Sequence, residues 1–143
     1  IPNPVLRKKY NAIVEQIHIG NGNLFGTIAL EAAYKEGDEW LEKLLTYLWD
    51  NVQFIIDYLN TNIPEIELIK PEGTYLAWLD CRKLDIPLDK IHKFMINEAK
   101  VGMNDGSSFG QNGKGFQRLN FGCPRIIVEK ALDNIFTSLK KNS

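Results

Sequence analysis

The sequence predicts an α+β fold in which three helices precede a half that mixes strands with helices. Apolar residues recur at helical spacing as far as Leu59, and after Pro64 the pattern changes to short apolar runs bounded by proline and glycine. The chain has 143 residues, of which 44% are hydrophobic and 24% are charged, so it is long enough to bury a hydrophobic core. We therefore expect one compact unit, or one unit with an additional part.

Each of the three predicted helices has a starting signal. Asn3-Pro4 fits a helix cap followed by the first helical position, and apolar residues then follow helical spacing. A loop rich in glycine and asparagine over 20–23 leads into a second helix over 27–34, which Gly37 ends. Asp38 is predicted to cap a third, unusually long helix with one broad apolar face.

The second half of the chain is predicted to alternate short strands, turns and helices. In order, it contains strands at 66–69 and 74–79 joined by a turn at 70–73, a helix over 87–99, a short strand at 101–103, a strand over 116–121 and a last amphipathic helix over 125–140. The first two strands are predicted to form a hairpin, because proline and glycine lie between them.

A glycine-rich segment over 106–115 precedes the last predicted strand. A Walker phosphate loop needs a glycine five positions before Gly113 and a hydroxyl residue after the lysine, but Ser108 and Gly115 occupy those positions. The dinucleotide fingerprint fails too, because its glycine spacing is reversed and it opens a helix rather than a strand. The segment is therefore interpreted as a flexible surface loop, or alternatively as a mobile flap over an active site.

One charged residue, Arg118, lies within the apolar run that predicts the last strand. Removing a guanidinium from water is costly unless a carboxylate or a phosphate meets it, and its planar fork fits a carboxylate with two hydrogen bonds. Arg118 is therefore a candidate anion clamp. The spacing alone also fits, and more commonly reflects, an arginine that points to solvent or pairs with a nearby acid.

Composition excludes several classes of function. The formal net charge of -1 argues against a nucleic-acid-binding protein, which normally has a basic excess. Cys81 and Cys123 form no CxxC pair, and His18 and His92 are isolated, so the sequence predicts neither a metal site nor a redox pair. No uncharged run approaches the roughly 20 residues of a membrane span. We expect a soluble protein of the cytoplasm.

Four motifs in order resemble the C-terminal part of a known enzyme family. They are NxFGxxAxxAAY at 23–34, GxxWLxxLxxY at 37–47, PEGTYLAWLD at 71–80 and GxGFxRLNFGCPR at 113–125. Together they resemble the pyridoxal-phosphate enzymes of fold type I, the class I/II aminotransferase superfamily, and within it the cystathionine β-lyase (C–S lyase) branch. The resemblance extends from Ile1 to about Leu139.

The resemblance implies a division of the chain and roles for three residues. Residues 1–37 would be the last helices of the large cofactor-binding domain, 38–61 an interdomain helix, and 62–143 the small C-terminal domain. In this superfamily an arginine in an Arg-x-Asn pattern holds the substrate α-carboxylate, and Arg118 matches it. Asn23 and Phe25 match a segment near the active site of the partner subunit, where many residues only shape the interface of a homodimer.

The resemblance also implies that essential parts lie ahead of Ile1. The lysine that binds the cofactor covalently, the aspartate that pairs with its ring nitrogen and most phosphate ligands would all precede this residue, and no lysine here has the family's Ser/Thr-x-Lys context. The chain is thus interpreted as a C-terminal fragment that lacks the N-terminal part of the large domain. Whether this chain alone is an enzyme stays open, and we expect it neither to hold the cofactor nor to turn over by itself.

The function implied by the resemblance is that of a pyridoxal 5'-phosphate-dependent lyase that breaks a Cβ–S bond in cystathionine-like amino acids. One alternative is an aminotransferase on the same fold, because a carboxylate clamp serves both reactions. An alternative of another class is a non-catalytic interaction module, in which the first three helices dock on another protein and the 106–115 segment is only a surface loop.

Overall fold

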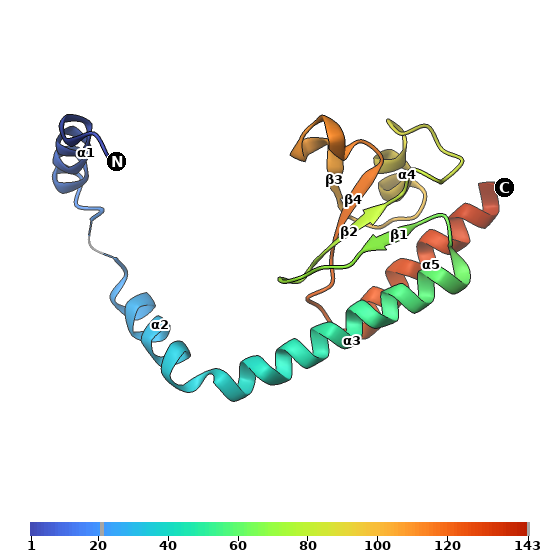
Figure 1. Cartoon of the computed structure of the whole chain (residues 1–143), viewed down its shortest axis with the longest axis horizontal. Helices are drawn as coiled ribbons and strands as arrows, with labels where there is room; N and C mark the ends of the chain where they lie inside the picture. The colour runs from blue at the N-terminus through green and yellow to red at the C-terminus, as the bar shows by residue number, and fades with distance from the viewer. Residues whose placement is uncertain (21, 143) are drawn as a thin grey trace. The chain divides into compact units, whose positions relative to one another are not determined.

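The computed structural model describes residues 1–20 and 22–142 of the chain, which divides into two units, Ile1–Lys43 (unit 1) and Leu44–Ser143 (unit 2). The loop predicted over 20–23 includes residue 21, which lies outside the described part. In chain order the elements are α1 (Pro4–Gln16), α2 (Leu24–Glu36), α3 (Asp38–Asn62), β1 (Glu67–Ile69), β2 (Leu76–Asp80), α4 (Ile91–Asn97), β3 (Asn104–Asp105), two 3-10 turns (Gly106–Phe109 and Gln111–Gly113), β4 (Phe116–Asn120) and α5 (Arg125–Asn142) (Figure 1).

Unit 1 consists of α1, α2 and the first residues of α3. The Asn3 side chain accepts hydrogen bonds from the backbone N–H groups of Val5 and Leu6 at 2.9 and 3.2 Å, which confirms the predicted cap. Asn23 caps α2 in the same way, so that helix begins at Leu24, ahead of the predicted start. No residue of α1 or α2 is buried.

The start of α3 corrects one prediction. The helix begins at Asp38 itself, and the carbonyl of Gly37 accepts the first helical hydrogen bond from the N–H of Leu41 at 2.9 Å. Gly37 therefore takes the capping position predicted for Asp38. Asp38 instead lies in the first turn, where a negative charge interacts favourably with the helix dipole.

Unit 2 contains a four-stranded antiparallel sheet in the order β1-β2-β4-β3. The predicted hairpin is confirmed, since β1 pairs with β2. The strand predicted at 101–103 is wrong: Val101 and Met103 are buried as core residues without strand pairing, and the ladder to β4 forms at Asn104 and Asp105. The helix predicted over 87–99 is shorter, because residues before Ile91 form a turn closed by the Lys90 N–H and the Pro87 carbonyl.

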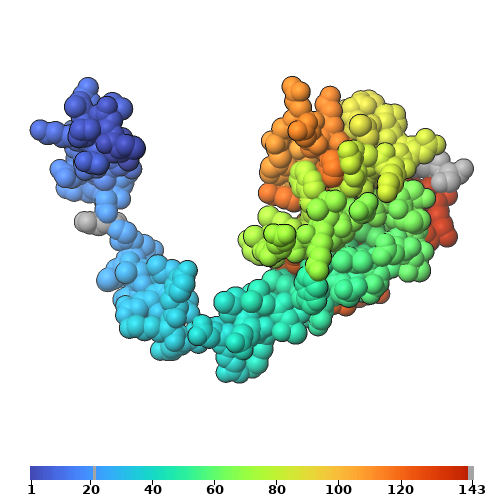
Figure 2. All heavy atoms as spheres, viewed as in Figure 1, coloured from blue at the N-terminus to red at the C-terminus, as the bar shows by residue number. Residues whose placement is uncertain are grey.

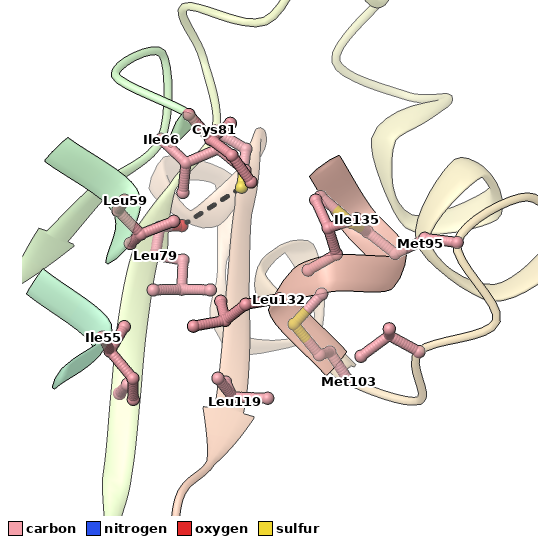
Figure 3. Packing of buried hydrophobic residues seen from close by; sticks show 14 of the residues in the cluster. Ile55, Leu59, Ile66, Leu79, Cys81, Met95, Met103, Leu119, Leu132 and Ile135 are labelled. Carbon is pink, nitrogen blue, oxygen red and sulfur yellow. Dashed lines mark hydrogen bonds between the residues drawn. The ribbon is translucent and has the colours of Figure 1, made fainter. Parts of the chain in front are cut away.

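One hydrophobic core lies between the sheet and the helices of unit 2. Alternate residues of β2 and β4, among them Leu79 and Leu119, are buried together with residues of α3, α4 and α5. Figure 3 shows Ile55 of α3 and Leu132 of α5 directed toward these strands, and the Cys81 thiol contacting the Leu79 carbonyl at 3.8 Å. The core fixes which face of the sheet each strand residue occupies.

The glycine-rich segment is more ordered than the predicted flexible loop. It forms two 3-10 turns that pack on each other, and both Gly106 and Gly113 are buried. A Cβ atom on Gly113 would lie 2.0 Å from the Gly106 carbonyl oxygen, so only glycine permits this approach. Figure 2 shows the segment in orange beside the strands of unit 2. Its packing gives the segment a defined surface.

A polar network joins the end of β4 to α3 and α5. The Asn51 amide, fully buried on α3, donates to the carbonyls of Phe121 and Cys123 at 3.0 and 3.1 Å. The same side chain accepts from the Arg125 guanidinium at 2.6 Å, and the Arg125 backbone N–H donates to the Tyr47 hydroxyl. Asn51 therefore anchors the strand end on the core helices.

No helix in the described part of the chain is long and apolar enough to cross a bilayer.

Candidate functional site

Arg118 lies at the centre of β4 with its side chain directed away from the core. It is directly opposite Trp78 of β2 and Asn104 of β3. Its strand neighbours Gln117 and Leu119 are buried, whereas Arg118 is half-buried, so the alternation of the strand places it on the opposite face of the sheet. We call this face, which carries Trp78, Asp80, Phe116 and Arg118, the outer face.

The Arg118 guanidinium is held by an amide and an aromatic ring. Its Nη2 and Nε atoms both donate to the Asn104 Oδ1 atom, at 3.1 and 3.4 Å, and its central carbon lies 4.6 Å from the centre of the Phe109 ring. Among residues 1–20 and 22–142, no carboxylate forms an ion pair with it. The charge is thus positioned by neutral groups and is not neutralised by them.

Aromatic rings form a continuous row beside Arg118. The Trp78 ring stacks on Phe116 with centroids 5.5 Å apart, and it meets Phe109 edge-on at 5.6 Å. Rings that contact one another in this way lose little further freedom when a ligand binds. The outer face therefore presents a cation at the border of a preformed aromatic surface.

A second arginine on the outer face, Arg82, has a different partner. Its Nε and Nη2 atoms donate to the two carboxylate oxygens of Asp80 at 2.9 and 2.6 Å, and its guanidinium also lies over the Phe116 ring. The hydrogen bond from Arg82 lowers the pKa of the Asp80 carboxyl below its usual range. Arg82 is therefore neutralised internally, and of these two arginines Arg118 is the one available to an external anion.

The glycine-rich segment positions the Phe109 ring under Arg118. Asp105 lies just before the segment and caps its first 3-10 turn, where its carboxylate accepts hydrogen bonds from the backbone N–H and the hydroxyl of Ser107. The hydroxyl bond lowers the pKa of Asp105, so the carboxylate stays ionised and keeps the first 3-10 turn closed. The predicted loop thus supports the site through Phe109. Whether it also acts as a flap stays a prediction.

The other predicted site residues are accounted for locally. Asn120, the last member of the Arg-x-Asn pattern, accepts from the Gly122 N–H at 2.8 Å and closes the turn after β4. Asn23 caps α2 by accepting from the Phe25 N–H at 3.0 Å, and the Phe25 side chain is 79% exposed. Asn23 and Phe25 belong to unit 1, where Asn23 has a structural role as a helix cap, and the proximity of both residues to an active site stays a prediction.

Two residues around Arg118 were not predicted from the sequence. Phe109 is the one aromatic residue in the 106–115 segment, which is a signal that could have drawn attention to it. Asn104 carries no such signal, because its importance depends on the register between β3 and β4.

Within the described residues, no group of three or more histidine, cysteine, aspartate or glutamate side chains is arranged to hold a metal ion.

Comparison with known proteins relates this geometry to one family. The chain is 33% identical over 139 residues to the cystathionine beta-lyase PatB of Bacillus subtilis, covering 97% of this chain and 36% of that protein. The family follows from this match and from the structural matches below. The chain belongs to the cystathionine β-lyase branch of the fold-type I pyridoxal-phosphate enzymes. It corresponds to the C-terminal part of these enzymes and spans about a third of their length.

Solved structures of this family superpose on the chain. Cystalysin from Treponema denticola, whose structure contains pyridoxal 5'-phosphate, matches with a TM-score of 0.83 and 30% identity over 100% of this chain and 36% of that one. The pyridoxal-phosphate-bound C–S lyase of Staphylococcus hominis, complexed with the inhibitor L-cycloserine, matches with a TM-score of 0.80 and 34% identity over 99% and 36%. Aminotransferases are among the further relatives. No protein-family model matches the chain.

Proposed function

We propose that the chain supplies the substrate α-carboxylate clamp of a pyridoxal 5'-phosphate-dependent C–S β-lyase that acts on cystathionine-like sulfur amino acids. The observation that carries the proposal is Arg118: a guanidinium positioned on a sheet, with no internal acid among the described residues to neutralise it. A two-pronged ion pair with a carboxylate satisfies such a group. This function would belong to a complete enzyme that contains this chain.

The clamp would act by orientation. Holding the carboxylate at Arg118 fixes the direction of the Cα–H bond of the substrate, and a well-oriented reacting bond lowers the barrier of the chemical step. When bound, pyridoxal phosphate supplies a conjugated ring that accepts the electrons released at Cα. The aromatic row of Trp78, Phe109 and Phe116 would exclude water from one side of the ion pair and so strengthen it.

The residues of this chain are better suited to binding the substrate carboxylate than to holding the cofactor. The outer face offers one arginine without an acidic partner, which matches a single carboxylate. The covalent lysine and the acid opposite the ring nitrogen are assigned, by resemblance to the family, to residues ahead of Ile1. We therefore propose that this chain contributes to substrate recognition, and that the cofactor is held mainly by the rest of the enzyme.

Unit 1 supports a further part of the proposal, that the enzyme is a homodimer. The exposed fractions of Phe25, Ile28 and Tyr34 on α2 are 79%, 56% and 82%, so unit 1 leaves much apolar surface without a cover of its own. We propose that the large domain or a second subunit covers it. A concentration-dependent sedimentation coefficient of the chain supports this. A monomer whose α1 and α2 amides are strongly protected from exchange contradicts it.

The reaction is tested by following products of the complete enzyme. β-Elimination from cystathionine breaks the Cα–H and Cβ–S bonds and releases a free thiol, and hydrolysis of the remaining three-carbon enamine by water gives pyruvate and ammonia. An aminotransferase, for which Arg118 would serve equally well, instead needs a 2-oxo acid as amino acceptor and releases no thiol. Thiol and pyruvate in equal amounts without added 2-oxo acid support the lyase. Turnover that depends on the 2-oxo acid supports the aminotransferase, and no turnover of either kind supports a non-catalytic module.

A further inference from the structure

The partner of Arg118 on the strand ladder is an amide rather than an acid. Asn104 lies directly opposite Arg118 in the register of β3 and β4, and its Oδ1 atom accepts from both Nε and Nη2. A guanidinium has two edges at which an anion can bind with two hydrogen bonds, one formed by Nε with Nη2 and the other by Nη1 with Nη2. Asn104 occupies the first edge. Among the described residues, no group accepts a hydrogen bond from Nη1.

The pair of Arg82 and Asp80 shows what the alternative would be. Arg82 is held at the same edge, by Nε and Nη2, and it also lies over an aromatic ring. Its acceptor is a carboxylate, so the charge of the Arg82 guanidinium is neutralised within the protein. Arg118 has the same arrangement of edge and ring with a neutral acceptor in place of the acid. The amide orients the guanidinium and leaves its charge for a ligand.

We propose that Asn104 is a positioning residue that presents the Nη1–Nη2 edge of Arg118 to the substrate carboxylate, and that its neutrality is required for this role. The proposal rests on the carboxylate clamp proposed above. Phe109 supplies the second restraint, because its ring covers one face of the guanidinium while the amide holds the edge. Together, Asn104 and Phe109 leave the Nη1–Nη2 edge of Arg118 open to an approaching carboxylate. A carboxylate then binds end-on, in line with the Arg118 side chain.

Asn104→Asp in the complete enzyme separates the effect of Asn104 on the orientation of Arg118 from its effect on the charge that Arg118 offers to the substrate. The substitution keeps the size of the side chain and an oxygen at the same edge, so we expect an unchanged or higher melting temperature. The added negative charge forms an ion pair with Arg118 and competes with the substrate, so KM for amino-acid substrates should rise roughly tenfold or more. If Asn104 were only a structural contact, KM would stay the same or fall in this variant, because aspartate is a better acceptor for a guanidinium than asparagine and would hold Arg118 more firmly.

Asn104→Leu provides a second variant, with Asn60→Leu as its control. Leucine keeps the bulk but removes the acceptor, so Arg118 keeps its charge and loses its orientation; we expect kcat/KM to fall roughly tenfold, mostly in kcat. Asn60 is exposed on α3, and its substitution should change neither quantity. Asn104 is itself exposed, so both of its variants are expected to fold.

The outcomes distinguish this proposal from the clamp on which it rests. If Arg118→Ala cripples the enzyme while Asn104→Asp and Asn104→Leu retain normal KM and kcat, the positioning role is overturned and the clamp stands. If Arg118→Ala is also near normal, the clamp fails and the positioning role falls with it. A raised KM for Asn104→Asp at an unchanged or higher melting temperature, together with a lowered kcat for Asn104→Leu, supports the proposal.

Discussion

Units 1 and 2 bury their apolar residues to very different extents. In unit 1, α1 and α2 contain no buried residue, and large apolar side chains such as Leu24 and Phe25 are 69% and 79% exposed. In unit 2, Ile55, Leu79 and Leu132 are completely buried in a core shared by the sheet and the helices. The helices of unit 1 have side-chain caps at Asn3 and Asn23, whereas α4 of unit 2 has none, so the difference does not come from local helix signals.

The difference shows that local structure and a stable core have separate causes. Capping and helical spacing specify α1 and α2, but isolated helices of this length are marginal in water because most helix stability in proteins comes from packing. Unit 2 supplies that packing from its own residues. Its sheet can therefore hold Arg118 in a fixed setting, whereas α1 and α2 of unit 1 have no buried residue that would stabilise them in this way.

The largest expected effect is on the free energy of unfolding of unit 2. Leu132→Ala removes a completely buried side chain from the core and should cost about 2–5 kcal/mol. Ile28→Ala, on α2, removes a side chain that is 56% exposed and should change stability by less than about 0.5 kcal/mol in the 143-residue chain. Urea unfolding followed by circular dichroism measures both. Similar costs for the two variants would contradict the contrast between the units.

The next effect concerns the two 3-10 turns that support Phe109. Gly113→Ala places a Cβ atom 2.0 Å from the Gly106 carbonyl oxygen and should destabilise unit 2 by about 1–3 kcal/mol. Gly102→Ala is the matched control, because no atom lies within 4 Å of its added Cβ, and it should be neutral to within about 0.5 kcal/mol. Equal melting temperatures for the two variants would mean that the segment is as flexible as the sequence suggested.

A smaller effect is expected for Asp80, and it depends on pH. The hydrogen bond from Arg82 lowers the pKa of Asp80, so its contribution to stability is complete above the unfolded-state pKa of about 4 and is lost as pH falls through the lower folded-state pKa. Because the Arg82 side chain is 55% exposed, solvent screening limits the cost of Asp80→Asn to about 0.5–1 kcal/mol at neutral pH. The difference in stability between the two proteins should shrink steadily as pH falls below about 4; a difference that stays constant or grows with falling pH would contradict this account.

Local signals predicted most of the secondary structure of this chain. Asn3 as a cap, the hairpin of β1 and β2, and the helix that starts at Arg125 all follow from residues close in sequence. The prediction of a strand at 101–103 failed because contacts between residues distant in sequence determine the structure there. Val101 and Met103 look like a strand because they are apolar, but their side chains enter the core, and strand pairing with β4 forms at Asn104 instead.

The candidate site was predicted in its central residue and missed in its surroundings. Arg118 could be singled out because a charge within an apolar run is uncommon and because it matches a family motif. Asn104 and Phe109 contact it only through the register of β3 with β4 and the packing of the two 3-10 turns. Neither feature is a property of a short stretch of sequence, so no local pattern could have assigned these two residues to Arg118.

The clamp is tested most directly by replacing Arg118 in the complete enzyme and measuring turnover alongside the absorbance of the bound cofactor. The guanidinium is proposed to meet the substrate, so Arg118→Ala should lower kcat/KM by about one to three decades while the cofactor spectrum stays unchanged. Arg118→Lys should recover only part of the activity, because a point charge does not hold the plane of a carboxylate. Near-normal kcat/KM for Arg118→Ala would contradict the clamp and make Arg118 an ordinary structural arginine.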